Sequence, residues 1–232
     1  MTTVAPVTDS TSLFLGTRKG AWILTADDRR TWSVEGPHFL GHIVQHAVLD
    51  PRDGRTLLLA MRTGHLGPTV MRSTDAGARW AEASRPPAFT SGERLARSLR
   101  AVFWLTPGHA DQPGVWYAGG SPQGLFRTED GGDTWAPVDG WNDHPMWETW
   151  SEYPEENTPD GSMLHSVIVD PRDPDHLYLG LSAGGIFEST DGGNGWTTLN
   201  ENVEAVFLPE PDADYGHDPH CVALHPLRPD RL

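Results

Sequence analysis

Histidines and arginines at the starts of expected strands are the side chains best placed to do chemistry. Four expected strands are each followed by a proline and can be aligned on it. In this alignment Gln45, Ala101, His165 and His220 occupy the same position, or level, along their strands. His46 and Arg100 are immediate neighbours of that level. If these strands surround a common channel, the imidazoles and the guanidinium group could bind a ligand in it. Alternatively, they are polar residues that bind channel water.

A second group of ionisable residues lies between residues 214 and 220. His217, Asp218 and His220 combine neutral imidazoles with a carboxylate, and divalent metal ions accept both kinds of ligand. Their spacing matches no established zinc motif, so a solvated acidic loop is the alternative interpretation. We therefore expect no obligatory cofactor, with a divalent metal at these residues as the one open possibility.

The connection over residues 141–163 is distinctive because tryptophans stand in it among acidic residues. The tryptophans are Trp141, Trp147 and Trp150. Such a mixture suits carbohydrate, because sugar faces stack on aromatic rings while hydroxyls bind carboxylates. Glu148 or Glu152 could then form an acid/base pair with Asp218 for glycoside hydrolysis, provided that their separation suits that reaction. In the alternative interpretation the segment is a lid whose tryptophans plug the channel, since exposed tryptophan is costly.

Arg62 and His65 fall between two expected strands, on the same side of the molecule as the long connections. Arg18 occupies the matching place in the first unit of the chain. Guanidinium groups bind carboxylates and phosphates through paired hydrogen bonds, so these arginines could clamp an anionic ligand. Surface charge without a ligand is the alternative.

The element that organises these residues is a turn, Ser-Thr-Asp-Gly-Gly-Asn-Gly-Trp at 189–196. Asp and Gly favour the backbone of a tight turn, and the tryptophan opens a return strand, so the turn predicts a β-hairpin. The unit recurs at 73–80 and 128–135, with a degenerate copy at 27–32, and the chain is therefore a repeat protein. We expect Asp75, Asp130 and Asp191 to bind their own turn amides, which is a structural role.

Each repeat contains about four short strands, which is typical of an all-β propeller built from four-stranded antiparallel blades. We expect a disordered lead over residues 1–11 and one propeller domain over 12–232. The expected blades span about 12–35, 42–83, 97–138 and 163–199, and a further blade begins at 219–232. A partial ring of a six- or seven-bladed propeller explains this pattern. A closed four-bladed ring, in which residues 220–224 complete the first blade, is the alternative.

Composition narrows the classes of partner. The chain has 232 residues with 25 Gly and 20 Pro, which fits many short strands joined by turns. A formal net charge of −15 disfavours a nucleic-acid partner. Cys221 is the only cysteine, so an internal disulfide or a cysteine-built zinc site is excluded. No apolar run is long enough for a membrane span and no secretory signal is visible, so we expect a cytoplasmic protein.

The Asp-containing turns resemble the Asp-box, or BNR, repeats of sialidases, xyloglucanases, sortilin-type receptors and photosystem II stability/assembly factors. The segments 16–20, 36–41, 67–70 and 164–166 resemble a bacterial group of BNR-repeat proteins labelled as related to that assembly factor or as glycosyl hydrolases. The resemblance implies a propeller that acts as a binding or assembly-factor-like module, with a protein partner or a small ligand such as a carbohydrate. A glycosidase-like hydrolase is the alternative. The chain lacks the Arg-Ile-Pro segment typical of sialidases.

Overall fold

The computed structural model describes residues 10–64, 67–90, 97–151, 162–204, 206, 208, 210 and 213–232. The fold is all-β, as expected, with four antiparallel sheets. The first sheet contains β1 (Thr11–Thr17), β2 (Gly20–Ala26) and β3 (Ser33–His38). The second contains β4 (Ile43–Leu49), β5 (Leu57–Thr63), β6 (Gly67–Ser73) and β7 (Ala81–Glu82).

The third sheet contains β8 (Ala101–Pro107), β9 (Trp116–Ser121), β10 (Leu125–Thr128) and β11 (Ala136–Pro137). The fourth contains β12 (Leu164–Val169), β13 (Leu177–Leu181), β14 (Gly185–Ser189) and β15 (Thr197–Thr198). Two short helices, α1 (Asp139–Asn142) and the 3₁₀ turn η1 (Thr149–Ser151), lie in the connection between these two sheets. Among the described residues, no helix has the length and apolar character needed to cross a membrane.

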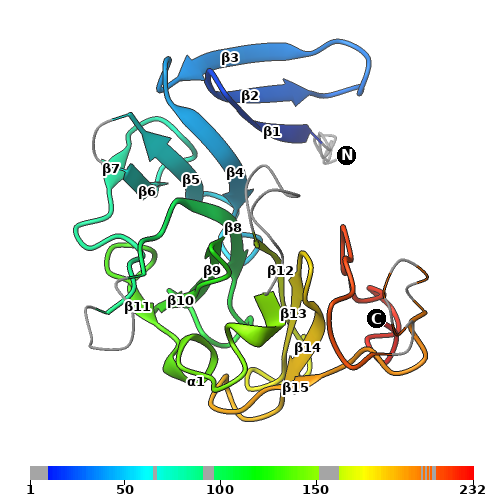
Figure 1. The fold of residues 1–232 in the computed structure, drawn as a ribbon. Coiled ribbons are helices and arrows are strands. Elements are labelled where there is room, and N and C mark those ends of the chain that lie inside the picture. Colours follow the sequence, from blue (N-terminus) through cyan, green and yellow to red (C-terminus); the bar gives the residue numbers. More distant parts are fainter. Residues whose placement is uncertain are drawn as a thin grey trace.

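The four sheets follow one another around an arc, like the blades of a propeller (Figure 1). The innermost strands of the complete blades are β4, β8 and β12, and each contacts the next around the centre. In the second and third sheets, the second strand of the blade packs on the innermost strand of the next blade: β5 packs on β8, and β9 packs on β12. β1 packs on β4 in the same way, so β1 corresponds to a second strand and the first sheet is a blade without an innermost strand.

The ring is not closed over the described residues. The first sheet and the C-terminal segment lie at different ends of the arc (Figure 1), and no described strand joins them. Residues 220–224, the expected start of a further blade, belong to no strand, although the Val222 amide donates to Ser166 Oγ at 3.4 Å. The alternative of a closed four-bladed ring is therefore wrong for this structure, and a partial propeller is correct.

Hydrophobic side chains fill the spaces between neighbouring blades. The second strand of a blade is buried on both faces, so its alternate residues face different blades. In β5, Leu58 and Ala60 join the core shared with the third sheet, whereas Leu59 and Met61 join the core shared with the first. A third core joins the third and fourth sheets around Trp141. Each blade is thus stabilised mainly by its neighbours.

The Asp-containing turns close one end of each complete blade. In the third sheet, Asp130 Oδ1 accepts hydrogen bonds from the amides of Asp133 and Thr134, at 3.0 and 2.9 Å. Asp75 accepts from the Arg79 amide and Asp191 from the Gly195 amide, both at 2.8 Å. The expected structural role of these aspartates is confirmed.

Hydrogen bonds to the turn carboxylates also shift their ionisation. Burial acts to raise the pKa of Asp130, but hydrogen bonds from the hydroxyl and amide of Thr134 outweigh it and lower the pKa to about 2. Hydrogen bonds from Arg79, side chain first and then amide, lower the pKa of Asp75 to about 2 as well. Both carboxylates therefore stay ionised at lower pH than an ordinary aspartate does.

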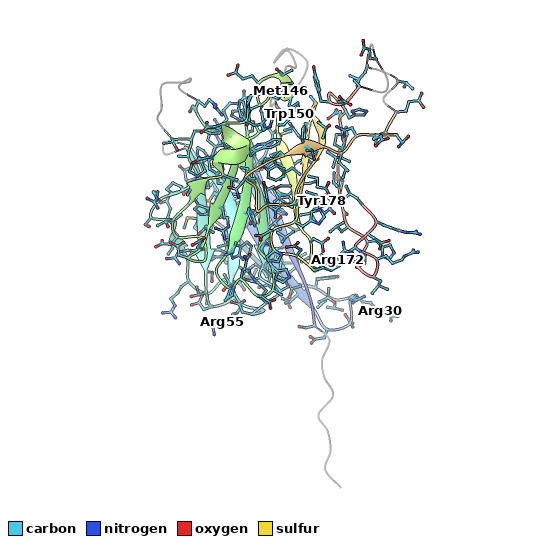
Figure 2. The ribbon with its side chains drawn as sticks, turned by 90° about the horizontal axis from the view of Figure 1, so that it is seen from below. Arg30, Arg55, Met146, Trp150, Arg172 and Tyr178 are labelled. Atoms are coloured by element: carbon cyan, nitrogen blue, oxygen red, sulfur yellow. The ribbon has the colours of Figure 1, made fainter. Side chains whose placement is uncertain are left out.

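The molecule has two distinct ends. We call the end with the Asp turns the Asp-turn face, and the end with the long connections and the starts of the innermost strands the connection face. Figure 2 shows Met146 and Trp150, from a long connection, at the opposite end from Arg55 and Arg30. The connection face carries any ligand site built from the long connections, and the Asp-turn face is closed by backbone turns.

Candidate functional site

The connection face carries a cavity of about 390 Å³ with arginines in its wall. Arg18 stands in the turn between β1 and β2, Arg62 near the end of β5, and Arg100 directly before β8. The three arginines belong to three successive blades, and all three are exposed. They share one cavity because the turn after β1, the end of β5 and the start of β8 all lie at the connection face of neighbouring blades. We call this site the arginine pocket.

The electrostatics of the arginine pocket contrast with the rest of the chain. The chain carries a formal net charge of −15 with only 17 Lys and Arg, yet the pocket holds three guanidinium groups and, among its described lining residues, no carboxylate. Among the described side chains, no ion pair involves Arg18 or Arg62. The pocket is therefore a local positive site that attracts anions.

Most of the remaining pocket wall comes from the innermost strands β4 and β8. Gln45 of β4 and Phe103 of β8 both line the pocket. Each is the extra residue of a β-bulge, because the pairing register shifts between Val44 and His46 and again between Val102 and Trp104. Bulges redirect side chains and are common near binding sites. The repeated bulge thus positions one side chain from each of these strands at the pocket.

The bulges correct the alignment made from sequence. His165 is the extra residue of the equivalent bulge in β12, so Gln45, Phe103 and His165 are structurally equivalent. The expected level instead contained Ala101, two residues away from Phe103. The error arose because Pro107 ends β8 itself, whereas the matching prolines, Pro51 and Pro171, follow their strands.

His46 contacts the neighbouring blade. Its ring stacks on Trp104 with 4.2 Å between ring centroids, and its Nδ1 accepts a hydrogen bond from the Leu105 amide at 3.0 Å. Burial lowers the pKa of His46 to about 4, so the imidazole is neutral at physiological pH. These contacts assign His46 to the seam between the second and third sheets.

His165 is buried and faces the C-terminal segment. Its Nδ1 lies 3.0 Å from Ser166 Oγ, and its Nε2 is buried without a hydrogen-bond partner among the described residues. Burial lowers the pKa of His165. Its ring lies near Gly180 of β13 and beside the segment that carries Val222, away from the arginine pocket. His165 is thus equivalent to the pocket residue Gln45 in the strand but is covered by a different part of the chain.

The tryptophans of the long connection lie in the hydrophobic core. Trp147 and Trp150 are 7% and 5% exposed, in the core cluster that contains Trp141. The Trp150 ring is stacked on Trp141 with 5.5 Å between centroids. Arg97 lies over the Trp147 ring at 4.3 Å from its centroid. These rings stabilise the junction of the third and fourth sheets, and their faces are covered by protein.

Of the expected acidic and metal-binding residues that the structure describes, Asp218 and His220 lie in contact, with Oδ2 and Nε2 3.7 Å apart, whereas the others have separate surroundings. Glu148 is exposed, and Asp218 Oδ1 accepts a hydrogen bond from the Ala183 amide at 3.3 Å. His217 is buried with Nε2 at 2.6 Å from the Val203 carbonyl oxygen, whereas the His220 side chain is 90% exposed. In the part of the chain that the structure describes, no three such side chains are grouped to hold a metal ion. Glu152 and His65 lie outside the described residues.

The structure thus brings together only part of the predicted set. Arg62 and Arg100, together with Arg18, share one pocket. Gln45 and Ala101, which the sequence alignment had placed together, line the same pocket. Sequence reasoning did not single out the other lining residues, which are Ile43, Phe103, Ser121 and Met163. In the sequence, Phe103 has the pattern of an ordinary strand residue, because an apolar side chain within an apolar strand does not indicate a bulge.

Comparison with known proteins supports the fold. No protein-family model matches the chain, and no curated protein matches it. Among solved structures, the GH74 enzyme of Niastella koreensis is similar, with 20% identity and a TM-score of 0.53 over 80% of this chain and 27% of that one. The GH74 xyloglucanase of Xanthomonas campestris gives 19% identity and a TM-score of 0.51, with the same coverage of 80% and 27%.

YCF48 of Cyanidioschyzon merolae also matches, with 17% identity and a TM-score of 0.42 over 84% of this chain and 57% of that one. The chain spans 27% of the length of the two GH74 enzymes. At these identities the likeness concerns the arrangement of the blades alone. The chain has a β-propeller fold, in the form of a partial ring.

Proposed function

We propose that this chain is a binding module of the Asp-box, or BNR, propeller type, whose ligand enters the arginine pocket with an anionic group. The observation that carries the proposal is the convergence of Arg18, Arg62 and Arg100, from three blades, on one cavity of about 390 Å³. Guanidinium groups bind carboxylates and phosphates in a bidentate manner, with geometric specificity and charge-assisted strength. A cavity of this volume is in the usual range for small-molecule sites.

Binding is favoured over hydrolysis by the positions of the side chains proposed for each role. Glycoside hydrolysis needs two carboxylates on either side of the scissile bond. The lining residues of the arginine pocket that the structure describes contain none. Trp147 and Trp150, the expected platforms for a sugar, have their faces covered in the core. The similar structures include GH74 enzymes, but a likeness in fold alone assigns no activity to this chain.

The proposal is tested by calorimetric titration of the purified chain with inorganic phosphate and with citrate at constant ionic strength. Arg62→Gln should weaken binding by about tenfold, because one charged hydrogen-bonding partner is worth roughly 1.5 kcal/mol or more. The matched control is Arg55→Gln, which makes the same charge change at the opposite end of the molecule (Figure 2). It should leave the affinity unchanged. Equal weakening by both variants, or no binding of any anion by folded protein, would refute the proposal.

A further inference from the structure

The arginine pocket is lined by two chemically different groups of side chains. The cationic group consists of Arg18, Arg62 and Arg100, one from each of the first three sheets. The apolar group, which we call the apolar side, includes Ile43 of β4, Phe103 of β8 and Met163, which precedes β12. A ligand that fills the pocket therefore meets both positive charge and hydrocarbon.

Phe103 is the most informative residue of the apolar side. It is half-buried in β8 and belongs to none of the three hydrophobic core clusters. Among the described residues its ring makes no aromatic contact, whereas the next residue, Trp104, stacks on His46. The bulge at Phe103 turns this side chain away from the core and into the pocket wall. The fold thus leaves an aromatic surface without a core partner beside three guanidinium groups.

Size also distinguishes between classes of anion. An inorganic phosphate or an acetate ion would occupy a small part of a cavity of about 390 Å³ and would leave the apolar side against water. A ligand with an apolar body would remove that surface from water while its charged group met the arginines. Gln45, an exposed amide in the same wall, offers a further hydrogen-bonding group for the charged end.

We infer that the ligand of the arginine pocket is an amphipathic organic anion, with a carboxylate or phosphate group at Arg18 and Arg62 and an aromatic or alkyl body against Phe103 and Met163. This inference rests on the proposed anion-binding function and specifies the body of the ligand. The two sides act in one binding event, because the same cavity contains both. The guanidinium groups select the charged end, and Phe103 selects the body.

The test uses matched probes that differ only in the apolar body: phenyl phosphate against inorganic phosphate, and phenylacetate against acetate. Calorimetric titration near neutral pH and at constant ionic strength should show about tenfold tighter binding of the phenyl compound in each pair. The two pairs also show whether the charged end is preferably a phosphate or a carboxylate.

Two variants separate the sides of the pocket. Phe103→Ala should reduce the preference for the phenyl compound to less than about threefold and leave the affinity for inorganic phosphate unchanged. Phe103→Leu, which keeps an apolar side chain, should give an intermediate preference and serves if the alanine variant does not fold. Arg62→Gln should weaken both members of each pair by the same factor.

The outcomes are distinguishable. If wild-type protein binds both members of a pair equally and Arg62→Gln weakens both, the inference is overturned and the proposed function stands. If Phe103→Ala and Phe103→Leu keep the full preference for the phenyl compound, the inference is overturned as well. If folded wild-type protein binds no anion at all, both the inference and the proposed function fail.

Discussion

At the scale of single residues, His46 shows how the seam between blades depends on an uncharged side chain. The ring lies flat against Trp104 and its Nδ1 accepts the Leu105 amide, so that nitrogen must carry no proton. Burial lowers the pKa of His46 from 6.5 to about 4. The unfolded chain therefore takes up a proton at His46 at higher pH than the folded protein does.

We predict that the stability supplied by His46 is complete above pH 6.5 and is lost as the pH falls from there toward about 4. The loss from this group should be at most about 3 kcal/mol. His46→Phe, which keeps an aromatic ring on Trp104, should be less stable than wild type near neutral pH by about 1 kcal/mol, because the Leu105 amide loses its acceptor. Urea unfolding at a series of pH values measures both effects.

The comparison depends on the slope of stability against pH. The slope between pH 6.5 and about 4 should be smaller in His46→Phe than in wild type. The control is His220→Gln, whose parent side chain is 90% exposed, and it should keep the wild-type slope. A wild-type slope in His46→Phe would show that other groups account for the acid sensitivity.

At the scale of elements, neighbouring blades are connected by an arginine that follows an innermost strand. Arg52 is held by the buried Asp50 through two hydrogen bonds of 2.8 Å, from Nε and Nη2. Its Nη1 donates to the Gln112 carbonyl oxygen of the next blade at 2.9 Å. In the fourth sheet Arg172 binds Asp170 in the same way and donates to the Pro229 carbonyl oxygen at 3.1 Å. The repeat therefore includes a connection between blades.

We predict that Arg52→Met lowers the free energy of unfolding by about 3 kcal/mol, because it leaves the carboxylate of Asp50 buried without its partner. The side chains of Arg52 and Asp50 are 12% and 7% exposed. The double variant Asp50→Asn with Arg52→Met should recover part of that loss, since the unpaired charge is gone. Urea unfolding of the two single variants and the double variant gives the coupling energy of the pair.

Arg172→Met provides the matched control for this pair. The Asp170 side chain is 1% exposed, but the Arg172 side chain is 53% exposed and His176 Nδ1 lies 3.5 Å from Asp170 Oδ2, so His176 and water can partly replace Arg172. Its loss of stability should be smaller than that of Arg52→Met. Equal losses, or a double variant no more stable than Arg52→Met alone, would argue against the buried-charge explanation.

At the scale of the whole molecule, the hydrophobic cores become larger along the arc. Among the described residues, the core between the first and second sheets contains four buried hydrophobic residues: Ala21, Val44, Leu59 and Met61. The core between the third and fourth sheets includes Trp141, Trp147, Trp150 and Trp196. None of the residues of β1 or β3 is buried, whereas every residue of β9 and of β13 is buried. Local stability should follow this gradient.

We predict that the backbone amides paired between β1 and β2 exchange with deuterium at least about tenfold faster than those paired between β9 and β10. Opening the first sheet exposes little buried surface, whereas opening the third sheet exposes two cores. Hydrogen exchange followed by mass spectrometry of peptic peptides measures the two regions in one sample. Equal protection of both sheets would show that the described blades unfold as one unit.

The sequence determined the features that depend on local interactions. The Asp turns and the hairpins on either side of them could be predicted because their hydrogen bonds join residues at most a few positions apart. The strands of the complete blades followed from short apolar runs between turns. The all-β propeller and its incomplete ring were then predictable from the repetition of one unit.

Tertiary structure decided what each functional side chain contacts. Arg18 and Arg62 share a pocket only because successive blades pack around one centre, and Phe103 joins them because of a bulge that no local signal marks. Trp147 and Trp150 occur in a polar segment, yet they enter a core formed by distant strands. The sequence by itself thus determined the repeated local backbone, where hydrogen bonds are short in range. The pocket depends on packing between segments far apart in the chain, and only the tertiary structure decided it.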